Sequence, residues 1–272
     1  MAVETRPVAL VTGASAGIGE AAARALVGAG FTVYGTSRRA AAGETRGGVV
    51  FLPLDVTDDV SVAGAVREVL ERSGRIDVLV NNAGIGSSGA SEESSVAQDQ
   101  IVFDVNVFGL MRMTKAVLPH MRAQGAGRII NISSVGGFAP QPFMAAYVAT
   151  KHAIEGYSES LDHEVREHGV RVLLVEPFNT NTPFDANVVR ADSPLPIYAE
   201  HRRIFDDVLA AAMRGGDDPA VVGKTIVAAA TDRKPKLRYP AGPRAGRISV
   251  LRRIVPARTF DKSVRKLNRL AA

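Results

Sequence analysis

The sequence predicts an α/β fold in which helices flank both faces of a doubly wound parallel sheet of about seven strands. Short apolar runs, typical of buried strands, alternate with helical patterns over about the first 180 residues. A glycine-rich turn separates the first apolar run from the first helical pattern. With 272 residues, 46% of them hydrophobic, the chain is long enough to form one large domain of this class.

The first strand and the turn after it predict a dinucleotide site in a Rossmann-type sheet. Residues 7–12 are mostly apolar, and residues 13–19 read Gly-Ala-Ser-Ala-Gly-Ile-Gly before a helical pattern over 20–29. Glycines let the backbone approach a phosphate, and N–H groups at a helix start point toward it. A lone glycine cluster is more often a simple turn, but its position between strand and helix favours phosphate binding. The expected contacts are Gly13, Ser15, Ala16, Gly17, Ile18 and Gly19.

The end of the second expected strand, residues 31–37, bears on the choice of cofactor. An acidic residue near this position bonds the ribose 2′-hydroxyl of NAD, whereas an arginine accommodates the 2′-phosphate of NADP. Here Ser37 is followed by Arg38 and Arg39, with no acid. The sequence therefore favours NADP over NAD; two solvated surface arginines are the alternative.

Two further strands are expected at residues 49–54 and 77–80. The first is followed by Asp55 and Val56, and residues 57–59 can cap the helix after it. The second ends in Asn81-Asn82-Ala83-Gly84, whose small side chains would let the backbone pass close to a flat ligand.

One long helix is expected over residues 94–124. Asn106 lies inside it, with Gly109 three residues later, and both residues lower helix stability. Asn106 is therefore a candidate functional residue.

Three polar residues after the fifth expected strand, residues 128–133, form the candidate catalytic group. Ser134 follows the strand, and open α/β sheets bind ligands at the carboxyl ends of their strands. Tyr147 and Lys151 are four residues apart in a helix expected to reach about His168, so their side chains share one face. A hydroxyl, a phenol and an ammonium can thus converge on one carbonyl oxygen.

The neighbouring lysine gives the tyrosine a chemical role. A free tyrosine has a pKa of roughly 10, and a cation within about 4–6 Å lowers it. We expect Lys151 to lower the pKa of Tyr147, which then acts as general acid or base. Ser134 would hold the substrate oxygen by a hydrogen bond. Tyr-x3-Lys alone is a weak pattern, and its weight comes from the motifs that precede it.

Over about residues 7–240 the chain resembles the short-chain dehydrogenase/reductase family. The resemblance rests on the glycine turn, the Asn81–Gly84 motif and four residues in the family's order, namely Asn106, Ser134, Tyr147 and Lys151. It implies that Tyr147 is the acid/base, that Lys151 tunes it and holds the ribose, and that Asn106 anchors a water that relays protons. The Tyr-x3-Lys spacing favours carbonyl and alcohol chemistry over enoyl reduction. The run from Ser134 looks most like the 17β-hydroxysteroid and retinol dehydrogenase branch.

The resemblance also assigns cofactor contacts. It places Asp55 and Val56 at the adenine and Arg38 at the 2′-phosphate. The remaining implied contacts are Asn82, Ala83, Gly84, Tyr147, Lys151, Pro177, Thr180 and Thr182. After the sixth strand, residues 171–176, Phe178 stands where the family commonly has glycine, and we expect its ring to narrow the site beside the nicotinamide.

Several large apolar residues flank the candidate site in the sequence. Ile85, Phe138, Phe143, Met144, Phe178 and Phe184 are expected to line a pocket for a bulky apolar substrate, with core packing as the alternative. Residues 183–215 include Pro194 and Pro196 and end at a Gly-Gly pair, and we expect a helical lid with mobile ends.

The end of the chain is basic. Asp218-Pro219 predicts a helix start, and a seventh strand is expected at 236–240. We expect residues 1–240, lid included, to form the dinucleotide-binding and catalytic domain, and residues 241–272 to form a basic extension of two amphipathic helices. We expect this extension to dock on the body. Packing against another subunit and contact with an anionic membrane surface are the alternatives.

Composition narrows the remaining classes. From Arg233 onward the net charge is +12 and before it −7, so the basic balance belongs to the tail and does not indicate nucleic-acid binding. There is no cysteine, the five histidines show no ligand spacing, and no apolar run approaches the roughly 20 residues of a membrane span. We expect a cytoplasmic homodimer or homotetramer without a metal.

The sequence thus predicts an NADP-dependent oxidoreductase that moves a hydride between nicotinamide and a ketone, aldehyde or alcohol. We expect a bulky apolar small molecule, similar to a steroid, a retinoid or an aldehyde. The alternatives are a nucleotide-sensing or scaffolding protein without catalysis, and a dehydratase or epimerase on a related fold. Such inactive proteins usually lack the Tyr or the Lys, and this chain has both.

Overall fold

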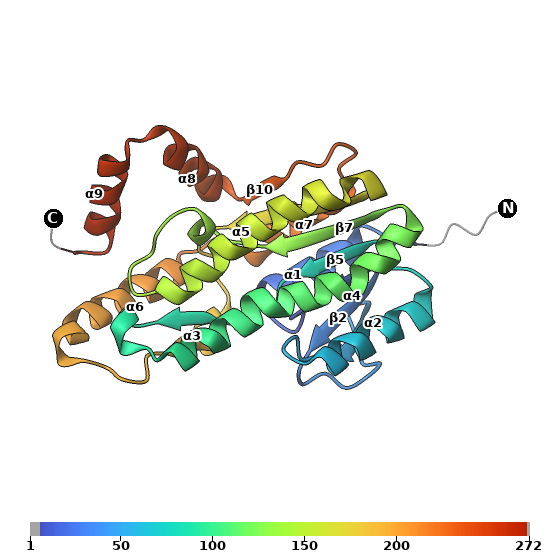
Figure 1. Ribbon diagram of the computed structural model, residues 1–272, viewed down its shortest axis with the longest axis horizontal. Helices are drawn as coiled ribbons and strands as arrows, with labels where there is room; N and C mark the ends of the chain where they lie inside the picture. Colours follow the sequence, from blue (N-terminus) through green and yellow to red (C-terminus); the bar gives the residue numbers. More distant parts are fainter. Residues whose placement is uncertain (1–5, 271–272) are drawn as a thin grey trace.

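A mostly parallel sheet of eight strands forms the centre of the computed structural model, which describes residues 6–270 (Figure 1). Its strands are, in order across the sheet, β10 (Arg238–Ala241), β8 (Val170–Pro177), β7 (Gly127–Ile132), β5 (Val78–Asn81), β1 (Val8–Val11), β2 (Thr32–Ser37), β4 (Val49–Pro53) and β3 (Thr45–Arg46). Only the β3–β4 pair is antiparallel. The strand order reverses beside β1, which is where doubly wound sheets open a crevice for ligands.

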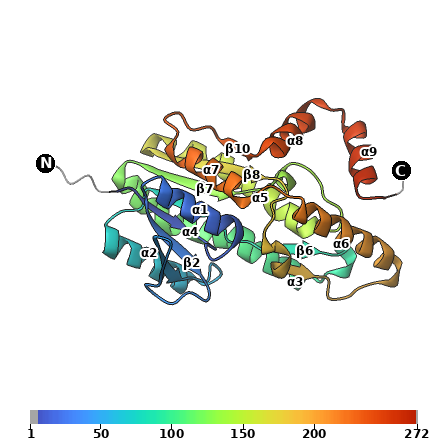
Figure 2. The ribbon, with the colours of Figure 1, turned by 180° about the vertical axis from the view of Figure 1, so that it is seen from behind.

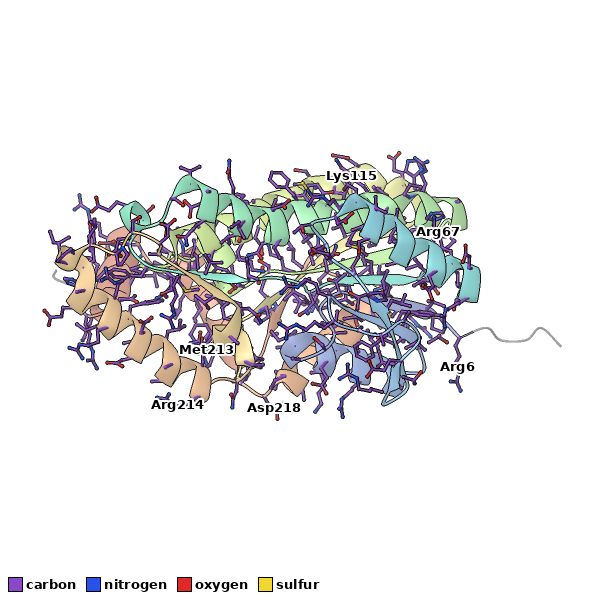
Figure 3. All side chains as sticks on the ribbon, turned by 90° about the horizontal axis from the view of Figure 1, so that it is seen from below. Arg6, Arg67, Lys115, Met213, Arg214 and Asp218 are labelled. Atoms are coloured by element: carbon purple, nitrogen blue, oxygen red, sulfur yellow. The ribbon has the colours of Figure 1, made fainter. Side chains whose placement is uncertain are left out.

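Helices cover both faces of this sheet. Helices α2 (Asp59–Ser73), α4 (Gly109–Gln124) and α5 (Ala145–Val165) lie on one face, and α1 (Gly17–Gly28) and α7 (Pro219–Thr231) lie on the other (Figures 1 and 2). In the view from below, Arg67 of α2 and Lys115 of α4 lie on one side, and Asp218 before α7 lies on the other (Figure 3). Each face has its own cluster of buried apolar side chains. The predicted α/β fold class is confirmed.

Two helix starts follow the predicted capping chemistry. The Asp58 side chain accepts hydrogen bonds from the backbone N–H groups of Val60 and Ser61, and Asp218 accepts one from Ala220. Each carboxylate satisfies N–H groups that have no partner inside the helix.

The expected long helix over 94–124 is present from Val96 to Gln124, but it contains a π-helical turn that was not predicted. The structure has α3 (Val96–Phe103), a π-helical turn (Asp104–Phe108) and then α4. The turn contains Asn106, whose side chain bonds the backbone of Ile85. The π-helical turn accommodates one extra residue without ending the helix. Such turns are common at functional sites.

A second, small sheet was not predicted. Strand β6 (Gly86–Ser88) pairs in parallel with β9 (Val188–Arg190) and joins the segment before α6 (Ala199–Arg214) to the body. Glu93, which is buried, accepts a hydrogen bond from the backbone N–H of Leu195 and pairs with Arg202. The segment expected to be a helical lid therefore begins with a 3-10 turn and a strand, and only its second half is a long helix.

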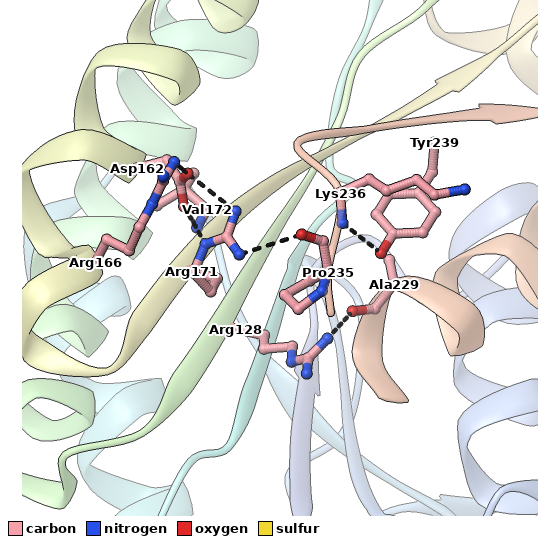
Figure 4. Close-up of polar contacts among 9 residues, drawn as sticks. All are labelled: Arg128, Asp162, Arg166, Arg171, Val172, Ala229, Pro235, Lys236 and Tyr239. Atoms are coloured by element: carbon pink, nitrogen blue, oxygen red, sulfur yellow. Dashed lines mark hydrogen bonds and ion pairs between the residues drawn. The ribbon is translucent and has the colours of Figure 1, made fainter. Parts of the chain in front are cut away.

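Polar contacts hold the amino-terminal ends of β7 and β8. Buried Asp162 of α5 pairs with Arg166 and Arg171, and its Oδ1 lies 2.8 Å from Arg171 Nε (Figure 4). Burial by itself would raise the pKa of Asp162, but hydrogen bonds from Arg171, Val172 and Arg166 lower it overall. Arg128 at the start of β7 donates to the carbonyl of Ala229. This network ties α5, α7 and the sheet together at the end opposite the site.

The basic extension forms the two expected helices, α8 (Pro243–Ile254) and α9 (Ala257–Leu267). Their inner side chains, Ala245, Ile248 and Phe260, pack against Val135, Phe138, Ala139 and Phe178. Gln141 Nε2 donates to Asn268 Oδ1 at 2.7 Å, and Arg252 Nε donates to the Phe138 carbonyl at 3.0 Å. The extension is thus docked on the loop that leads into α5. No helix within residues 6–270 is long and apolar enough to cross a bilayer.

Candidate active site

A cavity of about 1150 Å³ lies at the carboxyl ends of the strands and runs from the glycine turn to α9. Most residues expected at a cofactor or a substrate line it: Gly13, Ser15, Ala16, Gly17, Ile18, Arg38, Asp55, Val56, Asn82, Ala83, Gly84, Ile85, Ser134, Met144, Tyr147, Lys151, Pro177, Phe178, Thr180, Thr182 and Phe184. A single continuous space can therefore hold a dinucleotide and a substrate together.

Four expected site residues do not line the cavity. Gly19 and Asn106 lie behind its wall, where they shape the backbone. Phe138 packs on α8 and α9, and Phe143 contacts the rings of His201 and Phe205 instead. The expected places of Phe138 and Phe143 in the substrate pocket are corrected accordingly, because their rings fix neighbouring segments.

The glycine turn has a shape that only glycine permits. A Cβ atom on Gly19 would lie 2.2 Å from the Gly13 carbonyl oxygen, and Gly13 itself has a φ of +65°. Asn82 Nδ2 donates to the carbonyls of Thr12 and Gly13 at 2.9 and 3.1 Å, which ties the turn to the end of β5. These bonds fix the shape of the turn, whose glycines would let the backbone approach a pyrophosphate.

The far end of the cavity carries both signs of charge. Ser37, Arg38 and Arg39 line it at the end of β2, and both arginines are exposed. Hydrogen bonds from the backbone and hydroxyl of Thr57 lower the pKa of Asp55, and Arg38 adds a smaller effect in the same direction. Asp55 is therefore a carboxylate at neutral pH. The guanidinium groups of Arg38 and Arg39 are cations at the same end of the cavity and can bind an anion there.

Ser134, Tyr147 and Lys151 meet in the middle of the cavity. The Ser134 hydroxyl lies close to the Tyr147 phenol and accepts a hydrogen bond from the Gly136 N–H at 3.0 Å. Lys151 Nζ lies 5.5 Å from the centre of the Tyr147 ring and donates to the Ile132 carbonyl at 2.9 Å. The expected convergence of hydroxyl, phenol and ammonium is present.

The pKa shifts differ from the expectation. Burial raises the pKa of Tyr147, although the Ser134 hydroxyl opposes this, and no lowering by Lys151 offsets it. Burial lowers the pKa of Lys151 to about 8, with the Glu155 carboxylate opposing. The protein groups thus keep the phenol protonated at neutral pH, so Tyr147 holds a proton that it can donate.

Asn106 connects the π-helical turn to the catalytic helix. It is 2% exposed, and its Nδ2 donates to the Ile85 carbonyl at 2.9 Å and to Thr150 Oγ1 at 3.1 Å. Thr150 precedes Lys151 in α5. Asn106 is therefore in a position to fix both the start of the pocket wall and the turn that carries the lysine.

The comparison with known proteins decides the family. Residues 7–193 match the family model described as short chain dehydrogenase. The chain belongs to the short-chain dehydrogenase family. It is therefore an oxidoreductase of the CH–OH/C=O class, in a family that binds a nicotinamide cofactor, and the family prediction from the sequence is confirmed.

Three relatives show what this dehydrogenase is similar to. A 3-ketodihydrosphingosine reductase from Bacteroides thetaiotaomicron is 39% identical, covering 87% of this chain and 88% of the relative. The crystal structure of a short-chain dehydrogenase from Streptomyces avermitilis is 37% identical, with a TM-score of 0.82 over 98% of each chain. A 3-ketoacyl-(acyl-carrier-protein) reductase from Brucella melitensis, solved with NADH, is 26% identical with a TM-score of 0.74 over 88% of this chain and 98% of the other.

The apolar end of the dehydrogenase cavity is built largely by α6. Sequence reasoning missed the cavity-lining side chains of this helix, namely Phe205, Val208, Leu209, Ala212 and Met213. Their spacing of three and four residues is typical of one apolar helix face and was the available signal. On the opposite wall, the Phe184 ring packs edge-on against Tyr147 with 5.7 Å between the ring centres.

Behind Lys151 lies a pair of buried carboxylates. Glu155 is one turn further along α5, and Glu176 is the residue of β8 before the cavity-lining Pro177. Arg238 Nε lies 3.0 Å from Glu155 Oε2 and 3.4 Å from Glu176 Oε1. Burial and then Glu155 raise the pKa of Glu176 to about 7, and Arg238 and Arg253 oppose this.

Glu176→Gln is expected to stabilise the protein at alkaline pH. Because its pKa is higher in the folded chain than its ordinary 4.5, stability is lost as pH rises through about 7. At about 1.36 kcal/mol per pKa unit, this loss is roughly 3 kcal/mol at most. Urea unfolding at pH 8 should show the gain and at pH 5 very little. Glu159→Gln, which removes an exposed partner of Arg238, is the control; equal pH dependence in both variants would refute the assignment.

Proposed function

We propose that this dehydrogenase is an NADPH-dependent reductase of a bulky, apolar ketone or aldehyde. The supporting observation is the protonated phenol of Tyr147 beside the Ser134 hydroxyl, between the glycine turn and the apolar wall of α6. A protonated phenol can donate its proton to the carbonyl oxygen of a substrate, as reduction requires. The names of two relatives also specify reduction of 3-keto compounds.

Each protein group has a defined role in this proposal. When bound, the nicotinamide supplies the hydride that reaches the carbonyl carbon. Tyr147 donates its phenolic proton to the carbonyl oxygen, and Ser134 holds that oxygen while negative charge develops on it. Lys151 stabilises the phenolate that remains and holds the ribose, and Asn106 supports proton resupply through its bond to the turn before Lys151.

The shape of the turn supports a dinucleotide, with Gly13, Ser15, Gly17 and Ile18 around its phosphates. Asp55 and Val56 would face the adenine, and Thr180 and Thr182 the nicotinamide end. Asn82, Ala83, Gly84 and Pro177 complete the proposed contacts. Arg38 is the residue that would favour NADP over NAD, because a guanidinium forms strong charge-assisted bonds with a phosphate.

Arg38→Ala is expected to raise the KM for NADPH by roughly tenfold to a hundredfold while leaving the KM for NADH nearly unchanged. The lost interaction is a charge-assisted hydrogen bond, worth about 1.5–3 kcal/mol. Steady-state kinetics with each cofactor measure this selectivity. Arg39→Ala is the matched control for the neighbouring cation. A loss that is equal for NADPH and NADH in the Arg38 variant would contradict the 2′-phosphate contact.

The substrate is expected to lie between Ile85, Met144, Phe178 and Phe184 and the apolar face of α6. This wall favours steroid-, retinoid- or long-chain carbonyl compounds over small polar ones. A panel of such carbonyls, with NADPH oxidation followed by absorbance, tests the function directly; NADH is run in parallel. If no member of the panel drove oxidation, a cofactor-sensing role would replace the enzymatic one. The cytoplasmic location and the homo-oligomeric state also remain predictions.

A further inference from the structure

The outer face of α8 presents apolar side chains to solvent. Val250, Leu251 and Ile254 are 57%, 46% and 69% exposed, and their spacing places them on one side of the helix. The opposite side, with Ala245 and Ile248, packs on the body. Helix α8 therefore carries apolar side chains on both sides, with the exposed Arg247 among those of the outer side, and only the inner side is covered within residues 6–270.

Positive charge surrounds this apolar face. Residues 242–270 contain nine Lys or Arg and one acid, Asp261. Arg252 is engaged with the Phe138 carbonyl and the Phe260 ring, and Arg244 donates to the Gly215 carbonyl. The exposed basic residues of the same extension include Arg247, Arg258, Lys262, Lys266 and Arg269.

The same extension borders the mouth of the cavity. Arg244, Leu267 and Asn268 line the cavity, and Leu267 is nevertheless 68% exposed. In both ribbon views α8 and α9 project from the body beyond β10 (Figures 1 and 2). Whatever surface meets α8 and α9 therefore also lies close to the apolar end of the site.

We propose that α8 and α9 dock the protein on an anionic lipid surface, so that it reduces a carbonyl compound dissolved in that membrane. The source of the substrate rests on the proposed reductase function, whereas the docking does not. Apolar side chains that settle at the headgroup boundary, with lysines and arginines around them, are the features of helices that bind such surfaces. A second copy of the chain fits poorly, because symmetric pairing would bring two strongly basic faces together.

Docking is tested by co-sedimentation of the full chain with vesicles at low salt. The vesicles are phosphatidylcholine alone or with about 30% phosphatidylglycerol, a fraction that gives a negative surface potential. We expect binding to the anionic vesicles to exceed binding to the neutral ones at least about tenfold, and to fall steeply in about 0.5 M salt. Equal binding to both vesicle types, or binding to neither, would overturn the proposal.

Paired triple variants test the location of the contact. The patch variant carries Val250→Asp, Leu251→Asp and Ile254→Asp. The control carries Val60→Asp, Val96→Asp and Ile197→Asp, which are equally or more exposed and change the net charge by the same amount. We expect the patch variant to lose vesicle binding at least about tenfold and the control to lose much less. Equal losses of vesicle binding in the two variants would show that the net charge governs binding. They would refute a specific contact through Val250, Leu251 and Ile254.

Two further measurements separate this proposal from its alternatives. If α8 instead pairs two copies, the patch variant changes the oligomeric mass in sedimentation and does not change vesicle binding, which overturns the proposal. Turnover of a water-soluble carbonyl with NADPH should be the same in the patch variant and the unmodified protein. Reduction of a long-chain ketone embedded in anionic vesicles should fall about tenfold in the patch variant alone. Vesicle binding without any NADPH oxidation would support the docking proposal and refute the proposed reductase function.

Discussion

Tyr147→Phe is expected to lower the turnover number by roughly a hundredfold to ten-thousandfold, the usual contribution of a positioned acid. The substitution removes only the phenolic oxygen, which lies close to the Ser134 hydroxyl. The ring that packs edge-on against Phe184 stays, so the shape of the cavity is retained. NADPH binding should change little, because the oxygen that is lost faces the reacting carbonyl rather than the glycine turn.

The measurement is single-turnover NADPH oxidation, with cofactor binding followed separately by fluorescence. Tyr157→Phe is the matched control, since Tyr157 is on the same helix and packs in the core away from the cavity. A Tyr147 variant with a near-normal rate would show that another group supplies the proton. A variant that also failed to bind NADPH would show instead that the phenol holds the cofactor.

Gly19→Ala is expected to weaken NADPH binding at least about a hundredfold. The new methyl group would lie 2.2 Å from the Gly13 carbonyl oxygen and 2.4 Å from Asn82 Nδ2. Neither neighbour can move freely, because Asn82 holds the carbonyls of Thr12 and Gly13. The turn must therefore open, and the N–H groups that face the phosphates lose their positions.

Gly28→Ala provides the control for this glycine. It lies at the end of the same helix, and nothing lies within 4 Å of the position that its Cβ would occupy. We expect this variant to bind NADPH normally and to be slightly more stable, because alanine favours a helix more than glycine does. Isothermal titration gives the affinities, and circular dichroism checks that both variants are folded. Normal NADPH affinity in the folded Gly19 variant would contradict the proposed cradle.

The sequence predicted those structural features that depend on a residue type with a single physical role. Buried apolar strands and a glycine turn between strand and helix predicted the sheet and the cavity end that the structure shows. The capping carboxylates Asp58 and Asp218 were recognised because they precede helical patterns directly. Tyr147 and Lys151 share a face because α5 is regular across both of them.

Features that depend on distant contacts could not be predicted. Strand β6 is Gly-Ser-Ser, and it is a strand only because Val188–Arg190 pairs with it about a hundred residues later. The π-helical turn at Asn106 depends on the backbone of Ile85 from another segment. Phe143 has a φ of +63°, and its ring packs on α6 instead of entering the pocket, which its position near Tyr147 did not indicate.

The pKa values of the site residues could not be predicted from the sequence for the same reason. The spacing of Tyr147 and Lys151 predicted a lowered phenol pKa, but the depth of burial was unknown. Burial raises the pKa of Tyr147 and lowers that of Lys151 to about 8, because desolvation disfavours both charged forms. The proposed direction, reduction, is supported by the names of two relatives, and a protonated phenol is compatible with it.

The most direct test follows a labelled hydrogen. NADPH in which both hydrogens at the nicotinamide C4 position are deuterium is incubated with the protein and a long-chain ketone, and the alcohol product is analysed by mass spectrometry. The proposed reaction places one deuterium on the new carbinol carbon and takes its hydroxyl proton from Tyr147 and, through it, from solvent. Product without deuterium at that carbon, or no product while NADPH remains bound, would contradict hydride transfer at this site.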